Sequence, residues 1–176
     1  MKLFLVKPDL TYYEQYNEMM IEWCESKTHI APWFLDEPLE SLEKFEQLIR
    51  VLDNCEHGIV DKQFSSTSSF FVIDENGKLI GATSLRHYLT VAGYHSWGHI
   101  GYGVRPSERR KGYATQMLGM MLEEAKGKKI YKVLVGAYES NIGSCKTIEK
   151  CGGQFENSVC LENEEEAIRR YWFDLL

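Results

Sequence analysis

The run from Val104 to Thr115 has the residue types and spacing of an anion site. It precedes the strongest amphipathic pattern of the chain, so Gly112 stands where a helix begins. Unpaired backbone amides and the positive end of the helix dipole favour a phosphate at such a position. Arg109, Arg110 and Lys111 add positive charge there. Because cations at a helix start oppose the dipole, a basic cap without a ligand is the weaker explanation.

Two other phosphate-binding loops are excluded by the sequence. A P-loop requires G-x-x-x-x-G-K-[ST], and the dinucleotide fingerprint requires G-x-G-x-x-G; neither pattern occurs. Gly101 and Gly103 precede the loop, but the third glycine of the fingerprint is missing. The two glycines instead fit a strand that bulges or that another backbone approaches closely.

Periodicity predicts the elements that position this loop, in the order β-α-α-β-β-β-α-β-α-β-β. Helices are predicted from Thr11 to Trp23, over 39–53, from Ala114 to Ala125 and over 141–151, and strands over 3–6, 70–73, 79–85, 98–104, 130–137, 154–161 and 167–175. The segment Thr90 to Ser96 is a predicted loop, and the acidic run Glu162 to Glu166 a solvated turn. The strands on either side of the third helix should be parallel. We therefore expect one α+β domain over residues 1–176, with a mixed, mostly antiparallel sheet of about seven strands flanked by about four helices.

Charge and cysteine usage exclude several classes of protein. The net charge of -6 argues against broad attraction to nucleic acid. The five cysteines are odd in number and contain no C-x-x-C, which is typical of reduced thiols rather than of a metal site or a disulfide framework. No run approaches the roughly 18 apolar residues of a membrane span, and residues 1–10 are too short a run for a secretion signal. The sequence predicts a cytoplasmic protein that binds no metal, nucleic acid or membrane.

Two segments resemble the GNAT superfamily of acetyltransferases. Arg109-Arg110-Lys111-Gly112-Tyr113-Ala114 is similar to the R/Q-x-x-G-x-G/A signature of that superfamily. Asn141-Ile-Gly-Ser144 and Ile148-Glu-Lys-Cys-Gly152-Gly153 are similar to its N-x-x-S/A…E-K-x-G segment. The order of strands and helices agrees as well, so the resemblance covers most of the chain, and it is strongest to an uncharacterised bacterial branch of the superfamily.

The resemblance implies a coenzyme A site along these segments. Backbone amides around the signature would hold the pyrophosphate, and the fourth and fifth strands would splay apart to receive the pantetheine arm. An N–H group near Tyr102 to Val104 could also stabilise the oxyanion of the thioester. The implied coenzyme residues are Tyr102, Gly103, Val104, Arg109, Arg110, Lys111, Gly112, Tyr113, Ala114, Thr115, Asn141 and Ser144.

The groups that would move protons are less sharply defined. His99, on the fourth strand, lies one place from a position where the family often has a glutamate, and it is the first candidate for the base, unless it faces the other side of the sheet or only bonds the backbone. Glu139 is the second candidate and His87 the third. Ile148 occupies the position where many members carry a tyrosine that acts as the acid. Tyr138 or Tyr102 could instead donate the proton to the thiolate, and otherwise water or no enzyme acid does so.

The resemblance implies direct transfer of an acetyl group from acetyl-CoA to a primary amine on a small molecule or peptide. The missing tyrosine leaves two alternatives open, a non-catalytic acyl-CoA-binding or sensing domain and a transferase for a longer acyl-CoA. The acceptor pocket would be shaped by the first two helices and by the aromatic loop Thr28 to Pro38. In that loop Trp33 and Phe34 either line the pocket or fill the core. The terminal strand pair makes a homodimer possible.

Overall fold

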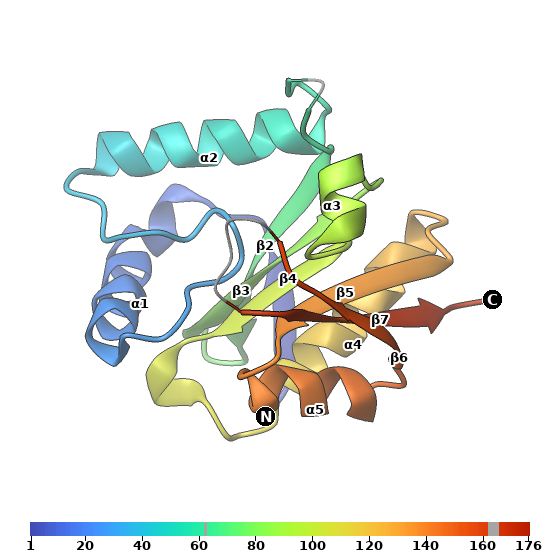
Figure 1. The fold of residues 1–176 in the computed structure, drawn as a ribbon. Helices are drawn as coiled ribbons and strands as arrows, with labels where there is room; N and C mark the ends of the chain where they lie inside the picture. The colour runs from blue at the N-terminus through green and yellow to red at the C-terminus, as the bar shows by residue number, and fades with distance from the viewer. Residues whose placement is uncertain (62, 162–165) are drawn as a thin grey trace.

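The computed structural model describes residues 1–61, 63–161 and 166–176, which form seven strands and five α-helices (Figure 1). The strands are β1 (Leu3–Val6), β2 (Thr67–Asp74), β3 (Leu79–Arg86), β4 (Ile100–Val104), β5 (Lys132–Tyr138), β6 (Gln154–Val159) and β7 (Ile168–Asp174). The α-helices are α1 (Tyr13–Ser26), α2 (Leu42–Glu56), α3 (Val91–His95), α4 (Tyr113–Gly127) and α5 (Ile142–Lys150), and short 3-10 turns cover Leu10–Tyr12 and Pro106–Glu108.

The strands form two antiparallel sheets, one in the order β1-β2-β3-β4 and one in the order β5-β7-β6. The predicted α+β class is confirmed, but the expectation of one mixed sheet needs correction. No parallel ladder joins β4 to β5 in the described residues. An isolated antiparallel bridge between Gly98 and Val135 connects the sheets instead. In it the amide of His99 donates to the carbonyl of Leu134 at 2.7 Å, and beyond it β4 pairs only with β3.

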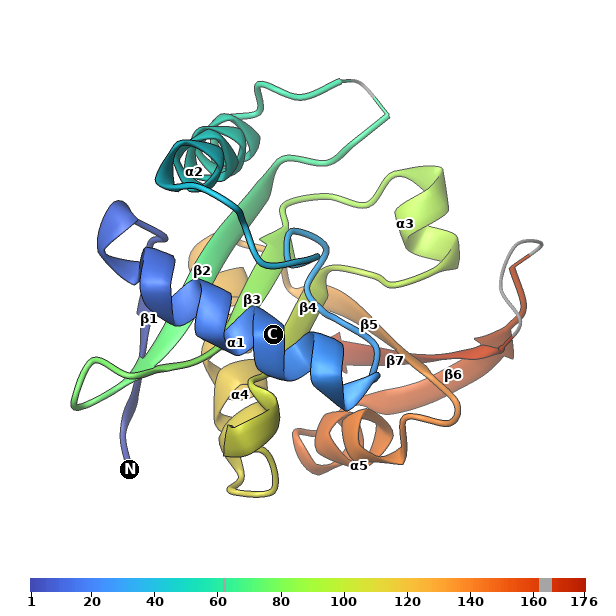
Figure 2. The ribbon, with the colours of Figure 1, turned by 90° about the vertical axis from the view of Figure 1, so that its left-hand side faces the viewer.

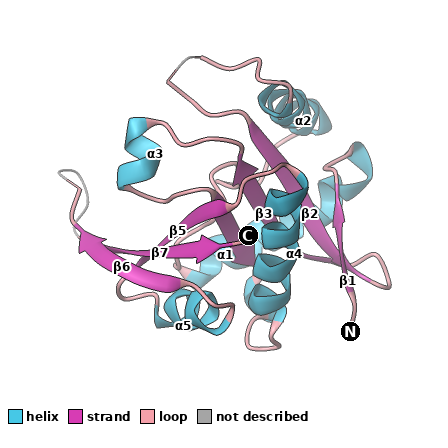
Figure 3. Cartoon of the chain, turned by 90° about the vertical axis from the view of Figure 1, so that its right-hand side faces the viewer, coloured by secondary structure: helices cyan, strands magenta, loops and turns pink. Residues whose placement is uncertain are grey.

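The first sheet is covered on both faces. Alternation along β2 sends Phe71 into a cluster with Phe45 of α2 and Trp23 of α1, on the face seen in Figure 2. The next residue, Val72, packs with Met117 of α4 on the other face, which Figure 3 shows. The loop between α1 and α2 contributes Phe34 to the first cluster. Of the two interpretations of this loop, pocket lining or core filling, Phe34 follows the second.

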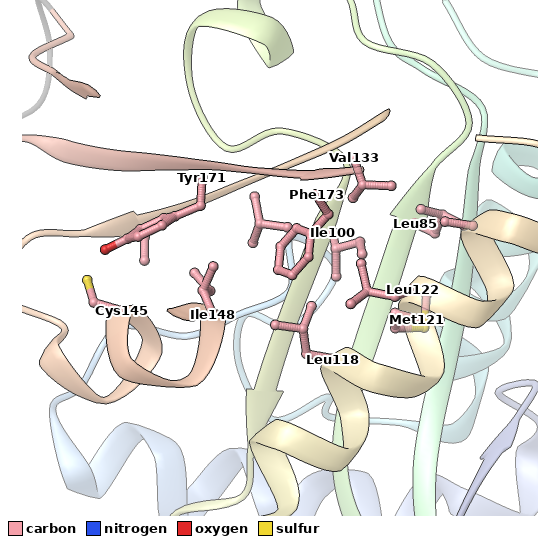
Figure 4. Packing of buried hydrophobic residues seen from close by; sticks show 13 residues of the cluster. Leu85, Ile100, Leu118, Met121, Leu122, Val133, Cys145, Ile148, Tyr171 and Phe173 are labelled. Carbon is pink, nitrogen blue, oxygen red and sulfur yellow. The ribbon is translucent and has the colours of Figure 1, made fainter. Parts of the chain in front are cut away.

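The amphipathic stripe predicted for the third helix is the buried face of α4. Met121 and Leu122 pack there with Ile148 of α5, with Phe173 of β7 and with residues of β5 (Figure 4). Each such side chain contributes roughly 1.5–3 kcal/mol when it is fully buried. This shared core fixes the starts of α4 and α5 beside the two central strands.

Two segments between elements differ from the sequence expectation or lie outside it. The predicted loop Thr90 to Ser96 contains the helix α3, which the Thr90 hydroxyl caps by accepting from the Gly93 amide at 3.2 Å. Of the predicted acidic turn 162–166, residues 162–165 lie outside the described residues.

Candidate active site

A cleft of about 830 Å³ lies beside the start of α4. Its walls come from the end of α1 and the following loop, the end of β4, the end of β5 and the first turns of α4 and α5. All predicted coenzyme residues except Lys111 line it: Tyr102, Gly103, Val104, Arg109, Arg110, Gly112, Tyr113, Ala114, Thr115, Asn141 and Ser144. Tyr102 and Ser144, which are 42 positions apart in the sequence, therefore lie in one cleft.

The start of α4 presents backbone amides to this cleft. Gly112 is the N-cap residue, with a left-handed φ of 81°, and no side chain caps the helix. The next residues, Tyr113 to Thr115, line the cleft, so the amides of the first turn are available to an anion. The left-handed backbone at Gly112 is one that residues with a side chain rarely adopt.

The three cations before Gly112 have different environments. Arg109 donates to the carbonyl of Val104 at 3.1 Å and to the hydroxyl of Thr28 at 3.0 Å, so it ties the loop after α1 to β4. Lys111 forms an ion pair with Glu108 at 2.8 Å and does not line the cleft. Arg110 is exposed and lines the cleft, which makes it the cation best placed to meet a phosphate.

The glycines of β4 allow a close approach by another backbone, as one of the two sequence interpretations expected, and that backbone is the loop after α1. A Cβ atom on Gly103 would lie 2.1 Å from the carbonyl oxygen of Ala31 and 2.6 Å from the ring of Trp23. The loop after α1 therefore packs directly on β4, and this contact places Thr28 and His29 in the cleft.

Side chains at the base of the cleft hold α5 to β4. The Tyr102 hydroxyl is aimed at the carbonyl of Ser144 at 3.5 Å, and burial raises its pKa. Asn141 caps α5, because its side-chain oxygen accepts from the Ser144 amide at 3.1 Å. Both Asn141 and Ser144 line the cleft, as the resemblance implied.

Both candidate proton donors, Tyr102 and Tyr138, line the cleft, and Tyr138 lies at the end of β5. Its ring meets the ring of Trp97 edge-on at 4.7 Å and that of His29 at 5.0 Å, and His29 stacks on Trp97 at 6.0 Å. These three rings form an aromatic cluster between the two sheets. Two of them, His29 and Tyr138, carry groups that can accept or donate a proton.

The three candidates for the base lie elsewhere. His99 is buried away from the cleft, its Nδ1 accepts from the Leu134 amide at 3.0 Å, and burial lowers its pKa to about 4. His87 contacts the Ser68 hydroxyl at 2.7 Å, outside the cleft. Glu139 is exposed beside Tyr138 but is not part of the cleft lining. The structure thus does not bring His99, His87 or Glu139 to the cleft.

Ile148 is fully buried and points from α5 toward the sheet, near Cys145 and Tyr171 (Figure 4). The position where the family often has a tyrosine is therefore part of the core in this chain. The five cysteines are free thiols. Among the described residues, no group of three His, Cys, Asp or Glu side chains is placed to hold a metal ion.

Several polar residues of the cleft were not expected from the sequence, among them His29 and Glu166. His29 belongs to the aromatic loop Thr28 to Pro38, and a lone histidine in a loop carries no signal for where it points. Glu166 accepts from the Ser140 hydroxyl at 2.8 Å and from the Ser140 amide, and both residues line the cleft beside Tyr138. In the sequence Glu166 is the last residue of a charge run, which usually marks a solvated turn.

A family model described as the Acetyltransferase (GNAT) family matches residues 27–153, which include the cleft residues of α4, β5 and α5. The chain belongs to the GNAT acetyltransferase family. The predicted family and enzyme class are confirmed by this match. In this GNAT protein the two sequence signatures, at the start of α4 and at the start of α5, line the same cleft.

Solved structures of known acetyltransferases share the fold of this GNAT protein. A chimera of the spermidine N-acetyltransferase SpeG from Vibrio cholerae and hSSAT has a TM-score of 0.66 at 18% identity, over 99% of this chain and 96% of that one. The microcin C7 self-immunity acetyltransferase MccE, in complex with acetyl-CoA and AMP, has a TM-score of 0.71 at 16% identity, over 98% and 92%. The ribosomal L7/L12 α-N-protein acetyltransferase RimL, in complex with coenzyme A, has a TM-score of 0.71 at 13% identity, over 99% and 95%. A search of curated protein sequences returned no significant match.

Proposed function

We propose that this GNAT protein transfers an acetyl group from acetyl-CoA directly to a primary amine bound at the aromatic end of the cleft. One observation carries the proposal: the uncapped start of α4 and the rings of His29 and Tyr138 open into the same cleft. An anion site and proton-moving groups in one cavity are what acyl transfer from a phosphorylated coenzyme requires.

The chemistry of the residues present fits coenzyme A. The amides of Tyr113 to Thr115 and the guanidinium of Arg110 hold the pyrophosphate. The backbone of Gly103 and Val104 lines the way from this anion site toward Tyr138. When bound, acetyl-CoA supplies the activated acyl group as a thioester.

Protons move at the aromatic cluster in this proposal. The imidazole of His29 takes a proton from the acceptor ammonium, and the free amine then attacks the thioester carbonyl. A carbon–nitrogen bond forms and the carbon–sulfur bond breaks. The Tyr138 hydroxyl gives a proton to the departing thiolate, and the second proton lost by the attacking nitrogen as the amide forms restores that hydroxyl, while His29 releases its proton to solvent. Glu139, which is exposed beside Tyr138, remains a candidate for a base that acts through water.

The acceptor is an amine that is positively charged before it reacts. Glu166 and Ser140 lie at the same end of the cleft as Tyr138. In this proposal the carboxylate of Glu166 attracts the ammonium group of the acceptor to that end. Two of the structurally similar enzymes are named for amine acceptors: one is a spermidine N-acetyltransferase and the other an α-N-protein acetyltransferase. A small molecule and a peptide end both fit this description.

The test is release of coenzyme A thiol with acetyl-CoA and a panel of polyamines, amino acids, aminoglycosides and peptides. Turnover with one class of amine, reduced at least tenfold in His29→Gln, supports the proposal. Tight coenzyme binding without thiol release from any amine would favour the non-catalytic acyl-CoA-binding alternative, which the buried Ile148 side chain makes worth testing. A preference for succinyl-CoA or longer acyl-CoA would favour the second alternative.

The proposal is accompanied by expectations about the location, the partners and the oligomeric state of the protein. Among the described residues, no helix has the length and hydropathy to cross a membrane. We place the protein in the cytoplasm, without nucleic acid or metal as partners. β6 is the edge strand of the second sheet and is largely exposed, so a homodimer through this edge stays a prediction.

A further inference from the structure

A second cavity, of about 520 Å³, lies between the end of α2, the segment after it and the ends of β2 and β3. It shares no lining residue with the cleft. Large apolar side chains line it and remain in contact with water: Trp33 is 47% exposed, Ile59 67% and Phe64 57%. Exposed apolar groups around a concave surface favour a ligand that covers them.

Arg86, the last residue of β3, brings a cation into the wall of this cavity. It is largely buried, and this burial lowers the pKa of its guanidinium. One of its nitrogens donates to the carbonyl of Gly98 at 2.8 Å, which is a neutral acceptor. Among the described residues, no carboxylate lies within 4.0 Å of Arg86, although Asp61 lines the same cavity. A cation removed from water without a counter-ion is costly, and a bound anion would compensate it.

We propose that this cavity is a second ligand site, for a small carboxylic acid with an apolar or aromatic body. The carboxylate pairs with the guanidinium of Arg86, whose planar donors match its two oxygens. The apolar body packs against Trp33, Phe64 and the side chain of Val51 on α2. The proposal goes beyond the transfer of the acetyl group and does not depend on it.

The segment 97–99 lies between the two cavities. Its Gly98 carbonyl accepts from Arg86, and the ring of its Trp97 stacks on His29 in the cleft. The two ligands therefore occupy different places and do not compete. Binding of the acid is expected in the presence of saturating coenzyme A.

Isothermal titration calorimetry with 3-phenylpropionate and its neutral amide tests the charge recognition. We expect the acid to bind at least tenfold more tightly than the amide, with and without coenzyme A, because an ion-paired hydrogen bond is lost in the amide. Arg86→Gln should abolish this difference. Arg50→Gln, which removes an equal charge from an exposed residue of α2 outside both cavities, should retain it.

A second variant keeps the test decisive if Arg86→Gln does not fold. Val51 is 47% exposed at the cavity, so Val51→Trp should fold and should weaken binding of the acid at least tenfold by filling the space. Equal affinity for acid and amide, no binding of the acid, displacement of the acid by coenzyme A, or unchanged binding in both variants would each overturn the proposal. Loss of acetyl transfer in the thiol assay would leave these results untouched.

Discussion

At the scale of single residues, the three cations before the start of α4 differ in their partners: Arg109 and Lys111 are bound to other protein groups, whereas Arg110 is exposed in the cleft. Arg109 lies over the ring of Trp23 at 5.3 Å and donates to the loop after α1. Lys111 is paired with Glu108, which also pairs with Lys78 at 2.6 Å. In the proposed function, phosphate binding therefore falls to Arg110 and the helix amides, although the sequence assigned the same role to all three cations.

Gly112 offers a test of the amide site. Replacement of Gly112 by Leu places a side chain over the amides of the first turn, so we expect coenzyme A to bind about tenfold more weakly or worse. Gly77→Leu is the matched control. Gly77 lies in the β2–β3 turn outside the cleft, has a similar φ of 78°, and has equally open space where a Cβ atom would be added. Calorimetric titration of both variants checks the effect; equal affinities for coenzyme A would refute the pyrophosphate assignment.

Tyr138 offers a test of the proton donor. In Tyr138→Phe the ring contacts with Trp97 and His29 remain, but the hydroxyl is lost. We expect kcat to fall about ten- to a hundredfold, with little change in the KM for acetyl-CoA, because the departing thiolate loses its proton donor. Tyr131→Phe, an exposed tyrosine outside the cleft, is the control. Steady-state kinetics with an unchanged kcat in Tyr138→Phe would leave water as the acid.

At the scale of elements, one carboxylate joins four segments that are far apart in the sequence. Glu56, the last residue of α2, pairs with Lys7 after β1 at 2.7 Å and with Lys128 after α4 at 3.1 Å. It also accepts from the hydroxyl of Ser68 on β2 at 2.9 Å. Burial raises the pKa of Glu56, but the hydrogen bonds from Lys7, Ser68 and Lys128 outweigh it and lower the pKa from 4.5 to about 2.

This cluster should make stability depend on acid. Because the folded state holds Glu56 ionised, its contribution is complete above pH 4.5 and is lost as the pH falls toward 2. Glu56→Gln should cost about 1–2 kcal/mol near neutral pH, a figure reduced for the partial exposure of the group, and nearly nothing at the acid end. Urea unfolding across this pH range checks it, with Glu123→Gln, an exposed residue, as the control. A cost independent of pH would contradict the ionic origin.

His99 links the two sheets and does not line the cleft. Its imidazole accepts from the Leu134 amide in the neutral form, and burial lowers its pKa from 6.5 to about 4. The folded state therefore prefers neutral His99, so this stabilisation is present above pH 6.5 and is lost as the pH falls toward 4. His99→Ala should lower the stability by about 1–3 kcal/mol, because the Leu134 amide loses its partner. Thermal unfolding and kcat measured together decide its role: a stable variant with a greatly reduced kcat would restore His99 as the base.

At the scale of the whole molecule, the sequence predicted the order of the elements except α3, and the helix start at which it expected an anion opens into the cleft. Both depend on local signals, such as the stripe of Met117 to Ala125 and the glycine before it. The acceptor end could not be predicted, because His29 reaches the cleft only through the packing of the Ala31 carbonyl on Gly103. Such contacts join distant loops and leave no period in the sequence. The division into two sheets was missed for the same reason, since β4 and β5 have the strand pattern whether or not they pair.

The Gly98–Val135 bridge has a mechanical consequence. The backbone amides of His99 and Gly136 donate across from one sheet to the other, and beyond this bridge β4 pairs with β3 and β5 with β7. Both bonds must break before the two strands can move apart at this point, so the deuterium exchange of these amides reports the rate of that opening. A coenzyme that bound β4 and α5 together would slow this exchange at two amides that it does not need to touch.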